Sequence, residues 1–299
     1  MKHILIPTDF SKNSWNAIAY ILQYYKTQVC KFYLLHTHPL KPSTIENMPT
    51  LTLKSIIEQS SIQLQDFKEQ ILKNYSNKLH SFETLNEFLS LPKAIKSCLK
   101  KYPIHKIIMG TKQTCKHKPN LFGTTTKYIM DAITNSPIFI IPDNYNHQPI
   151  KEVLFPTDLN RFYSENEINL IKQITIEHNA TLRVLNIKGN KSLNKIQKYN
   201  LSVLKQGFNS IETHYHSINN YNKKETIINE CIEKLSIDLL IMVNYKHNIV
   251  KRIIHEPVIK KIGIKPHIPF LIIPEIMKIN TNPKTPIHHE NTTHNNTMV

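Results

Sequence analysis

The chain has 299 residues, which corresponds to about two domains, and 40% of them are hydrophobic, which is enough for ordinary buried cores. No apolar run approaches the roughly 18 residues that span a bilayer, and a proline and an aspartate within the first ten residues exclude a secretory signal. The four cysteines show no paired spacing, so we expect reduced thiols and a cytoplasmic protein.

The formal net charge of +16 makes nucleic-acid binding one possible interpretation. However, the lysines are scattered along the whole chain, mostly on what read as polar helix faces, and no RNA-binding motif of aromatic and basic residues accompanies them. The pattern therefore favours a compositional bias towards Lys, Asn and Ile, and nucleic acid is the disfavoured partner.

Strand and helix patterns alternate along the first half of the chain. Short apolar runs predict buried strands at HILIP, KFYLLHT, HKIIMG and PIFII, and KLHSFETL is a weaker candidate. Helical spacing of apolar residues lies between them at 15–22, 64–71, 91–99 and 128–133. This alternation predicts a parallel sheet with helices on both faces.

The second half repeats the landmarks of the first. ILIPTDF at 4–10 returns as VLFPTDL at 153–159, and NSPIFIIP at 135–142 returns as PHIPFLIIP at 266–274. Two tandem α/β domains follow, each a doubly wound, Rossmann-like fold with a five-stranded parallel sheet. The expected boundaries are a first domain at 1–142, a linker at 143–150, a second domain at 151–275 and a disordered polar tail at 276–299.

A candidate ligand site lies in the first half. Ligands of doubly wound sheets bind beyond the carboxyl ends of the strands, where the strand order reverses. The first predicted strand ends in Pro7-Thr8-Asp9 and the fourth in Met109-Gly110, so both ends should open into one crevice. Gly110 is expected to allow a tight turn and a close approach to a ligand.

The segment MGTKQTCKHKPNLFGTTT at 109–126 should cross this crevice. Gly123 precedes Thr124 and Thr125, and Thr124 is a candidate cap for the helix that follows. Free N–H groups at a helix start attract anions, and Lys112, Lys116 and Lys118 add positive charge. The segment is either a phosphate-binding loop or an ordinary surface loop with a glycine turn.

These motifs resemble those of tandem universal stress proteins of the UspA type, over nearly all of residues 1–275. The matching motifs are Pro7-Thr8-Asp9, Leu34-Leu35-His36-Thr37, and Gly110-Thr111-Lys112-Gln113 followed after nine residues by Gly123-Thr124. The resemblance implies ATP binding, with Mg²⁺ only as a companion of ATP. It places Thr8, Asp9 and Thr37 at the nucleoside, and Met109, Gly110, Gly123, Thr124 and Thr125 at the lower pocket and the phosphates. Gln113 departs from the pattern because it replaces the family's second glycine.

Other features bear on this site. Asp158 repeats Asp9 in the second half, so Asp9 is either a ligand contact or a structural cap for the next helix. In the second half, His255-Glu256-Pro257 and Val243 stand in place of the glycine loop and Gly110. A carboxylate repels phosphate and a proline has no N–H to donate, so we expect a degenerate domain that stabilises the first.

The histidine pairs lack a third ligand, so no metal site is expected.

The function that these features predict is nucleotide-dependent regulation in the stress response, without catalysis. An interaction module that binds no nucleotide is an alternative, favoured by Gln113, and a weak nucleotide hydrolase is a further one. The sequence has no P-loop motif G-x-x-x-x-G-K-[ST], no G-x-S-x-G motif and no evident Cys-His pair. The protein partner is unknown. The apolar fifth strands at 138–141 and 270–273 are expected to pair within the chain, with a further homodimer left open.

Overall fold

The computed structural model describes residues 1–38, 49–111, 124–188, 192–220, 222, 224–244 and 267–275. The expected tail, the loop at 112–123 with Gln113 and Gly123, and residues 255–257 of the second half lie outside this range.

Strands and helices alternate through both halves. The first half contains β1 (Lys2–Pro7), α1 (Lys12–Tyr24), β2 (Cys30–Thr37), α3 (Thr50–Asn74), β3 (His80–Glu87), α4 (Leu91–Lys101), β4 (Lys106–Thr111), α5 (Thr124–Ala132) and β5 (Ile138–Pro142). The second contains β6 (Glu152–Thr157), α6 (Glu165–Glu177), β7 (Thr181–Lys188), α7 (Lys195–Gly207), β8 (Thr213–Asn219), α8 (Lys224–Lys234), β9 (Leu239–Asn244) and β10 (Phe270–Pro274).

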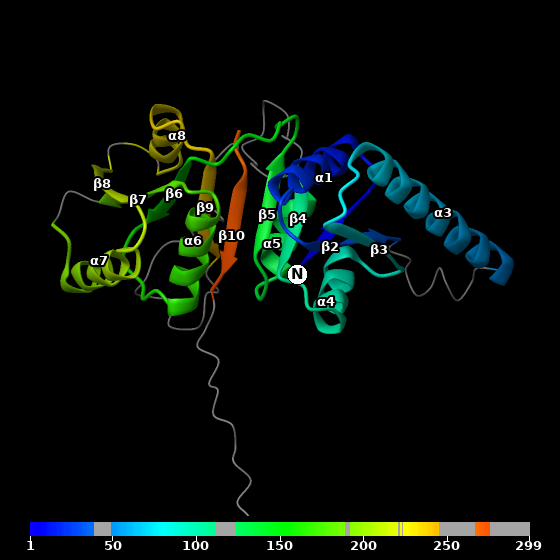
Figure 1. Cartoon of the computed structure of the whole chain (residues 1–299). Coiled ribbons are helices and arrows are strands. Elements are labelled where there is room, and N and C mark those ends of the chain that lie inside the picture. The colour runs from blue at the N-terminus through cyan, green and yellow to red at the C-terminus, as the bar shows by residue number, and fades with distance from the viewer. Residues whose placement is uncertain are drawn as a thin grey trace, which may run out of the picture.

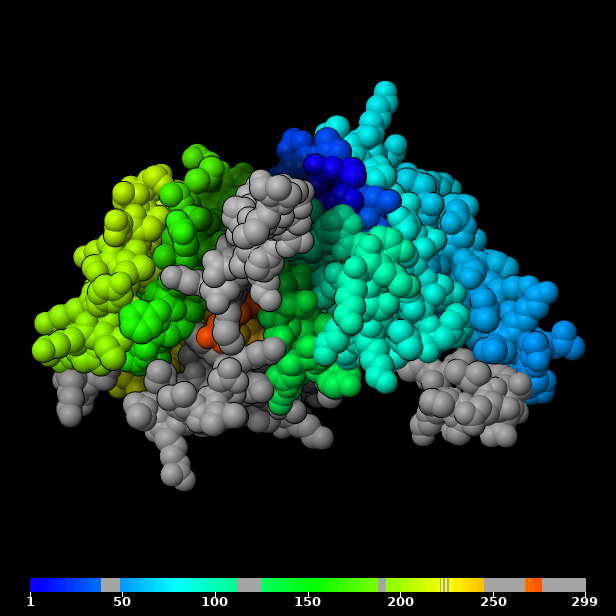
Figure 2. Space-filling view, turned by 90° about the horizontal axis from the view of Figure 1, so that it is seen from below, coloured from blue at the N-terminus to red at the C-terminus, as the bar shows by residue number. Residues whose placement is uncertain are grey.

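All ten strands form one continuous sheet in the order β3-β2-β1-β4-β5-β10-β9-β6-β7-β8 (Figure 1). Each half contributes five parallel strands, which confirms the predicted doubly wound α/β fold. The two halves meet where β5 pairs antiparallel with β10, with Leu271 opposite Phe139. The predicted pairing of the two fifth strands within one chain is therefore present, and Figure 2 shows β10 in orange between the halves.

Helices cover both faces of this sheet, because successive strand residues point to opposite sides. Ile4 and Ile6 of β1 join one buried cluster with residues of α1, α3, α6 and α7. Leu5 of β1 joins a second cluster with residues of α4, α5 and α8. Cys98 and Cys231 lie in this second core, as their apolar spacing predicts.

The connection between the halves packs against the first helix. Tyr145 and His147 lie at ring-centroid distances of 5.9 and 5.1 Å from Tyr20 of α1. Farther along α1, the ring of Tyr24 lies 4.6 Å from that of His178, which follows α6. The halves therefore share side-chain contacts as well as the β5–β10 pairing. No helix in the described residues is long and apolar enough to cross a membrane.

Candidate functional site

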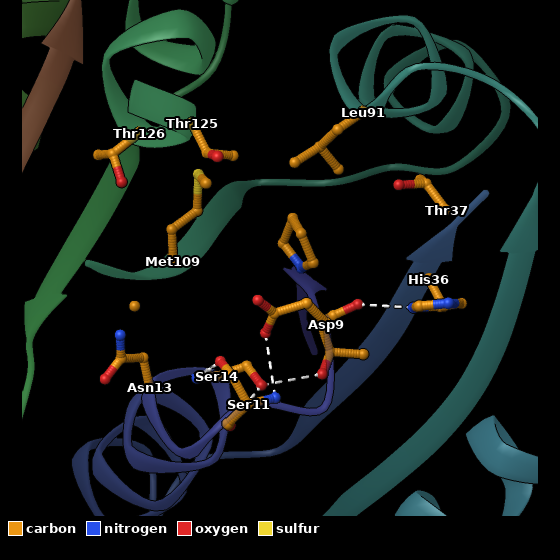
Figure 3. Close-up of a pocket in the computed structure, with 13 residues that line it drawn as sticks. Asp9, Ser11, Asn13, Ser14, His36, Thr37, Leu91, Met109, Thr125 and Thr126 are labelled. Carbon is orange, nitrogen blue, oxygen red and sulfur yellow. Dashed lines mark hydrogen bonds between the residues drawn. The ribbon is translucent and has the colours of Figure 1, made fainter. Parts of the chain in front are cut away.

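A pocket of about 410 Å³ opens at the carboxyl ends of β1, β2 and β4 (Figure 3). It lies at the point where the strand order reverses, as in other doubly wound sheets. All of its lining residues come from the first half: Pro7, Thr8, Asp9, Ser11, Asn13, Ser14, His36, Thr37, Leu91, Met109, Gly110, Thr125 and Thr126.

The turn after β1 is held by the side chains of Thr8 and Asp9. Thr8 Oγ1 accepts a hydrogen bond from the Phe10 backbone N–H at 3.1 Å, and Asp9 Oδ1 accepts one from the Ser11 backbone N–H at 3.1 Å. Phe10 itself adopts a left-handed φ of 60°, which is rare for a bulky residue. The two side chains thus stabilise an unfavourable backbone conformation at the edge of the pocket.

The same turn recurs after β6 in the second half. Leu159 also has a φ of 60°, Thr157 Oγ1 accepts from the Leu159 N–H at 3.0 Å, and Asp158 Oδ1 accepts from the Asn160 N–H at 3.0 Å. Because the turn is identical where the pocket is almost absent, the aspartate has a structural role in both halves. Contact between Asp9 and a ligand would be an additional role.

Asp9 carries a negative charge at neutral pH. Burial is the largest single effect and would raise the pKa of its carboxyl, but the hydrogen bonds from Ser11, from the Asp9 backbone and from Ser14 together leave that pKa below its ordinary value. A carboxylate at this position repels phosphate and accepts hydrogen bonds from hydroxyl or amine groups. The chemistry around Asp9 therefore suits the nucleoside part of a nucleotide and not its phosphates.

Gly110 lies inside β4 and is glycine for a reason that differs from the expected one. Neither described glycine has a positive φ, so no tight turn occurs at this position. Instead, a Cβ on Gly110 would lie 2.4 Å from the backbone oxygen of Asn13 and 2.8 Å from its carbonyl carbon. The missing side chain allows the first turn of α1 to pack directly on β4.

That first turn supplies pocket residues which the sequence analysis did not single out. Ser11 caps α1 by accepting a hydrogen bond from the Ser14 N–H at 3.3 Å, and Ser14 Oγ receives a hydrogen bond from Thr8 at 3.1 Å. Asn13 lies between them and also lines the pocket. A serine such as Ser11 just before an apolar helical pattern is a helix-start signal that the sequence itself offers.

His36 belongs to a chain of hydrogen bonds that leads away from the pocket. Its Nδ1 lies 2.8 Å from the carbonyl oxygen of Thr8, so Nδ1 carries the proton. Its Nε2 lies 3.1 Å from Nε2 of His38, which is also 2.8 Å from Ser60 Oγ. Because Ser60 donates its hydroxyl proton to Asn86 at 2.9 Å, its hydrogen bond with His38 requires Nε2 of His38 to be the donor.

His36 therefore makes its hydrogen bonds at the carboxyl end of β2. Burial, together with the neighbouring His36, lowers the pKa of His38 and favours its neutral form. Within the described residues, no group of three or more His, Cys, Asp or Glu side chains could hold a metal ion.

Among the described residues of the second half, the equivalent place holds a cavity of only about 20 Å³. The hydroxyl of Tyr163 hydrogen-bonds to Thr157 where Ser14 bonds to Thr8 in the first half, so a phenol ring replaces a small side chain. Arg161 stacks over that ring at 4.4 Å and forms a 2.8 Å ion pair with buried Glu167. Burial raises the pKa of Tyr163 to about 12, so the phenol remains neutral.

The helix after β6 also begins later than its counterpart. α1 starts five residues after Pro7, whereas α6 starts nine residues after Pro156, a delay of one helical turn. Val243 of β9 is the equivalent of Gly110 of β4. The strand registers show this, because Lys106 and Leu239, each four residues earlier, pair with equivalent residues of β1 and β6. A side chain on β9 thus occupies the space that an early helical turn would need.

The structure brings together most of the site residues predicted from the sequence. Thr8, Asp9, Thr37, Met109, Gly110 and Thr125 line one pocket. α5 begins at Thr124, and its cap geometry involves residues outside the described range, so the capping role of Thr124 stays a prediction. Gly123 and the three loop lysines lie outside the described residues, so the phosphate-binding part of the prediction stays a prediction.

Comparison with solved structures identifies the same architecture elsewhere. A universal stress protein from Archaeoglobus fulgidus DSM 4304 superposes with a TM-score of 0.68 at 16% identity, covering 91% of this chain and 97% of that one. A functionally unknown protein from Pseudomonas aeruginosa PAO1 gives a TM-score of 0.58 at 11% identity, covering 91% and 92%. No family model and no curated protein matches the sequence. The chain therefore has the fold of a two-domain universal stress protein.

Proposed function

We propose that this chain is a universal stress protein that binds an adenine nucleotide in the pocket of its first half and acts as a regulatory protein without catalysis. The observation that carries the proposal is the asymmetry between the halves. The first has a pocket of about 410 Å³ at the strand-order reversal, and the second has about 20 Å³ at the equivalent place. The larger volume lies within the range of roughly 300–1,000 Å³ that is usual for small-molecule sites.

The pocket residues suit a nucleoside. Leu91 and Met109 provide apolar surface for a base, while Thr37 and the Asp9 carboxylate provide partners for hydroxyl or amine groups. The phosphates would extend towards the start of α5, where Thr125 lines the pocket and free backbone N–H groups favour anions. The phosphate part of the proposal also includes Gly123 and Thr124. It includes Mg²⁺ only as a companion of ATP.

Calorimetry with ATP on the full chain tests the proposal. Thr37→Ile is the informative variant, because the strand registers place Ile187 at the equivalent position of β7. Loss of a hydroxyl contact should weaken ATP binding by about tenfold, equivalent to roughly 1.4 kcal/mol. Ser14→Tyr, which introduces the side chain found at residue 163, should abolish binding by filling the pocket.

Two outcomes would contradict this function. Absence of binding heat with ATP at about 1 mM would favour an interaction module that binds no nucleotide. Equal affinity in the wild type, Thr37→Ile and Ser14→Tyr would place the nucleotide outside this pocket. Phosphate release measured alongside the calorimetry separates regulation from hydrolysis, and we expect no turnover.

A further inference from the structure

We propose a second ligand site in the first half, for a neutral, ring-shaped ligand that carries several hydroxyl groups. The site is a groove of about 830 Å³, and most of its lining residues belong to α1 and α3. We call it the α1–α3 groove. It shares only Ser11 with the lining of the nucleotide pocket, and its ligand is independent of the nucleotide proposal.

Aromatic rings form the floor of the α1–α3 groove. Phe67 of α3 is 6% exposed, and its ring centroid lies 5.3 Å from that of Phe10 and 5.5 Å from that of Trp15, both at steep angles. Trp15 in turn lies 6.2 Å from Tyr75. Edge-to-face contacts of this kind hold each ring in place, so the apolar floor is formed before any ligand arrives.

Side-chain amides surround this floor. They belong to Asn16, Gln63, Gln70, Asn144 and Asn146. Asn16 donates one hydrogen bond to the carbonyl of Pro142 at 3.0 Å. In the described part of the chain, the other four amide side chains make no hydrogen bond, so each offers a donor and an acceptor to a ligand.

The charges of the groove are balanced. Lys12 and Asp66 are its only charged residues, one of each sign, so the lining attracts neither an anion nor a cation as a whole. A phosphate backbone would meet a carboxylate, and a lipid surface would have to desolvate the amide rim.

A neutral sugar ring fits both parts of the groove. Its C–H face stacks on aromatic rings, and its hydroxyl edge pairs with carboxamides that can donate and accept. A free carbohydrate and the ribose of a nucleoside share this chemistry.

In the second half, α6 and α7 correspond to α1 and α3, and they pack together without an open groove at the equivalent place. α7 packs against α6 so closely that a Cβ on Gly207 would lie 2.6 Å from Cγ2 of Ile168. In the first half, small Ala19 of α1 instead lines an open groove. The two halves have therefore diverged at this place as well as at the pocket.

Trp15 is the only tryptophan of the chain, so its fluorescence reports directly on the groove. The probes are maltotriose and N-acetylglucosamine as carbohydrates and adenosine as the nucleoside, each titrated into the full chain. Ala19→Leu is the blocking variant, because a larger side chain on α1 fills the groove. The double variant Gln63→Ala, Asn146→Ala removes two exposed amides without touching the core, and Thr37→Ile alters the pocket alone.

We expect at least one probe to change Trp15 fluorescence saturably, with at least tenfold weaker binding in Ala19→Leu and in the double amide variant. Thr37→Ile should leave that affinity within twofold. Binding of maltotriose or N-acetylglucosamine would identify the ligand as a free carbohydrate, and binding of adenosine would identify it as a nucleoside.

Absence of a saturable change with every probe overturns the proposal. Binding that follows Thr37→Ile and ignores both groove variants also overturns it, because that result assigns the ligand to the pocket. ATP binding in the pocket is tested separately by calorimetry, so the pocket proposal and the groove proposal can fail independently.

Discussion

Replacing Gly110 should displace the first turn of α1 and thereby damage the pocket. A Cβ at this position would lie 2.4 Å from the Asn13 oxygen, whereas ordinary contacts begin near 3.4 Å. The turn must therefore move by about 1 Å, and no side-chain rotation can relieve the clash because the contacted atoms belong to the backbone. Overpacking of this kind costs about 1–3 kcal/mol, and Ser11, Asn13 and Ser14 would move with the turn.

Gly110→Ala and Gly110→Val form a graded pair, and valine is the residue that the second half has at the equivalent position. The free energy of unfolding, measured in urea, should fall by roughly 1–2 kcal/mol for alanine and by more for valine. Amide exchange at residues 12–15 should accelerate, and ATP binding should weaken at least tenfold.

Gly207→Ala is the matched control. There the added Cβ would lie 2.6 Å from Cγ2 of Ile168, a buried and β-branched side chain of α6 in the second half that must shift to admit it. We expect a loss of stability like that of Gly110→Ala but no change in ATP affinity. If Gly110→Ala leaves the unfolding free energy within about 0.5 kcal/mol and residues 12–15 protected, the close approach of α1 is not what requires glycine.

Two further predictions concern the contact between the halves. Burial lowers the pKa of His178 to about 4 from 6.5, against a smaller opposing effect of Glu177, while Lys106, His147 and Lys2 reinforce the shift. The unfolded chain then binds the proton more readily, so stability is complete above pH 6.5 and falls towards pH 4, by at most about 2 kcal/mol after allowance for partial exposure. Urea unfolding of wild type and His178→Gln at pH 7 and pH 5 should show a larger loss in the wild type than in the variant, and equal losses would contradict this prediction. Because one sheet joins both halves, unfolding followed by Trp15, which reports only the first half, should coincide with unfolding followed by circular dichroism; separated curves would indicate independent halves.

The sequence predicts the order of elements and the place of the pocket, because both depend on local patterns. Alternating apolar runs identify the strands, and the repeated ends of the two halves identify the β5–β10 pairing. The apolar spacing at 64–71 indicates a long helix, and α3 extends over Thr50–Asn74, well beyond that spacing at its start. Its first turns are mostly exposed and have no buried face to mark them.

What the sequence could not supply are contacts between distant segments. Gly110 is glycine because of a residue 97 positions earlier in the chain, and no local pattern records that approach. Tyr163 hydrogen-bonds to Thr157 only six residues earlier, yet the apolar pattern does not show that its ring takes the place of Ser14 in the first half. The α1–α3 groove likewise combines two helices with the connection between the halves, which lie far apart in the sequence.

Because β10 pairs antiparallel with β5, the second half is needed to complete the sheet even if it has no pocket of its own. Both strands are fully buried at the centre of the sheet, so a chain without the second half would expose the apolar edge of β5 to water and to other chains. A partner on the same chain remains bound at any dilution, whereas two separate subunits come apart as their concentration falls. The strand at Phe270 therefore covers the edge of β5 whether or not the crevice at Tyr163 holds a ligand.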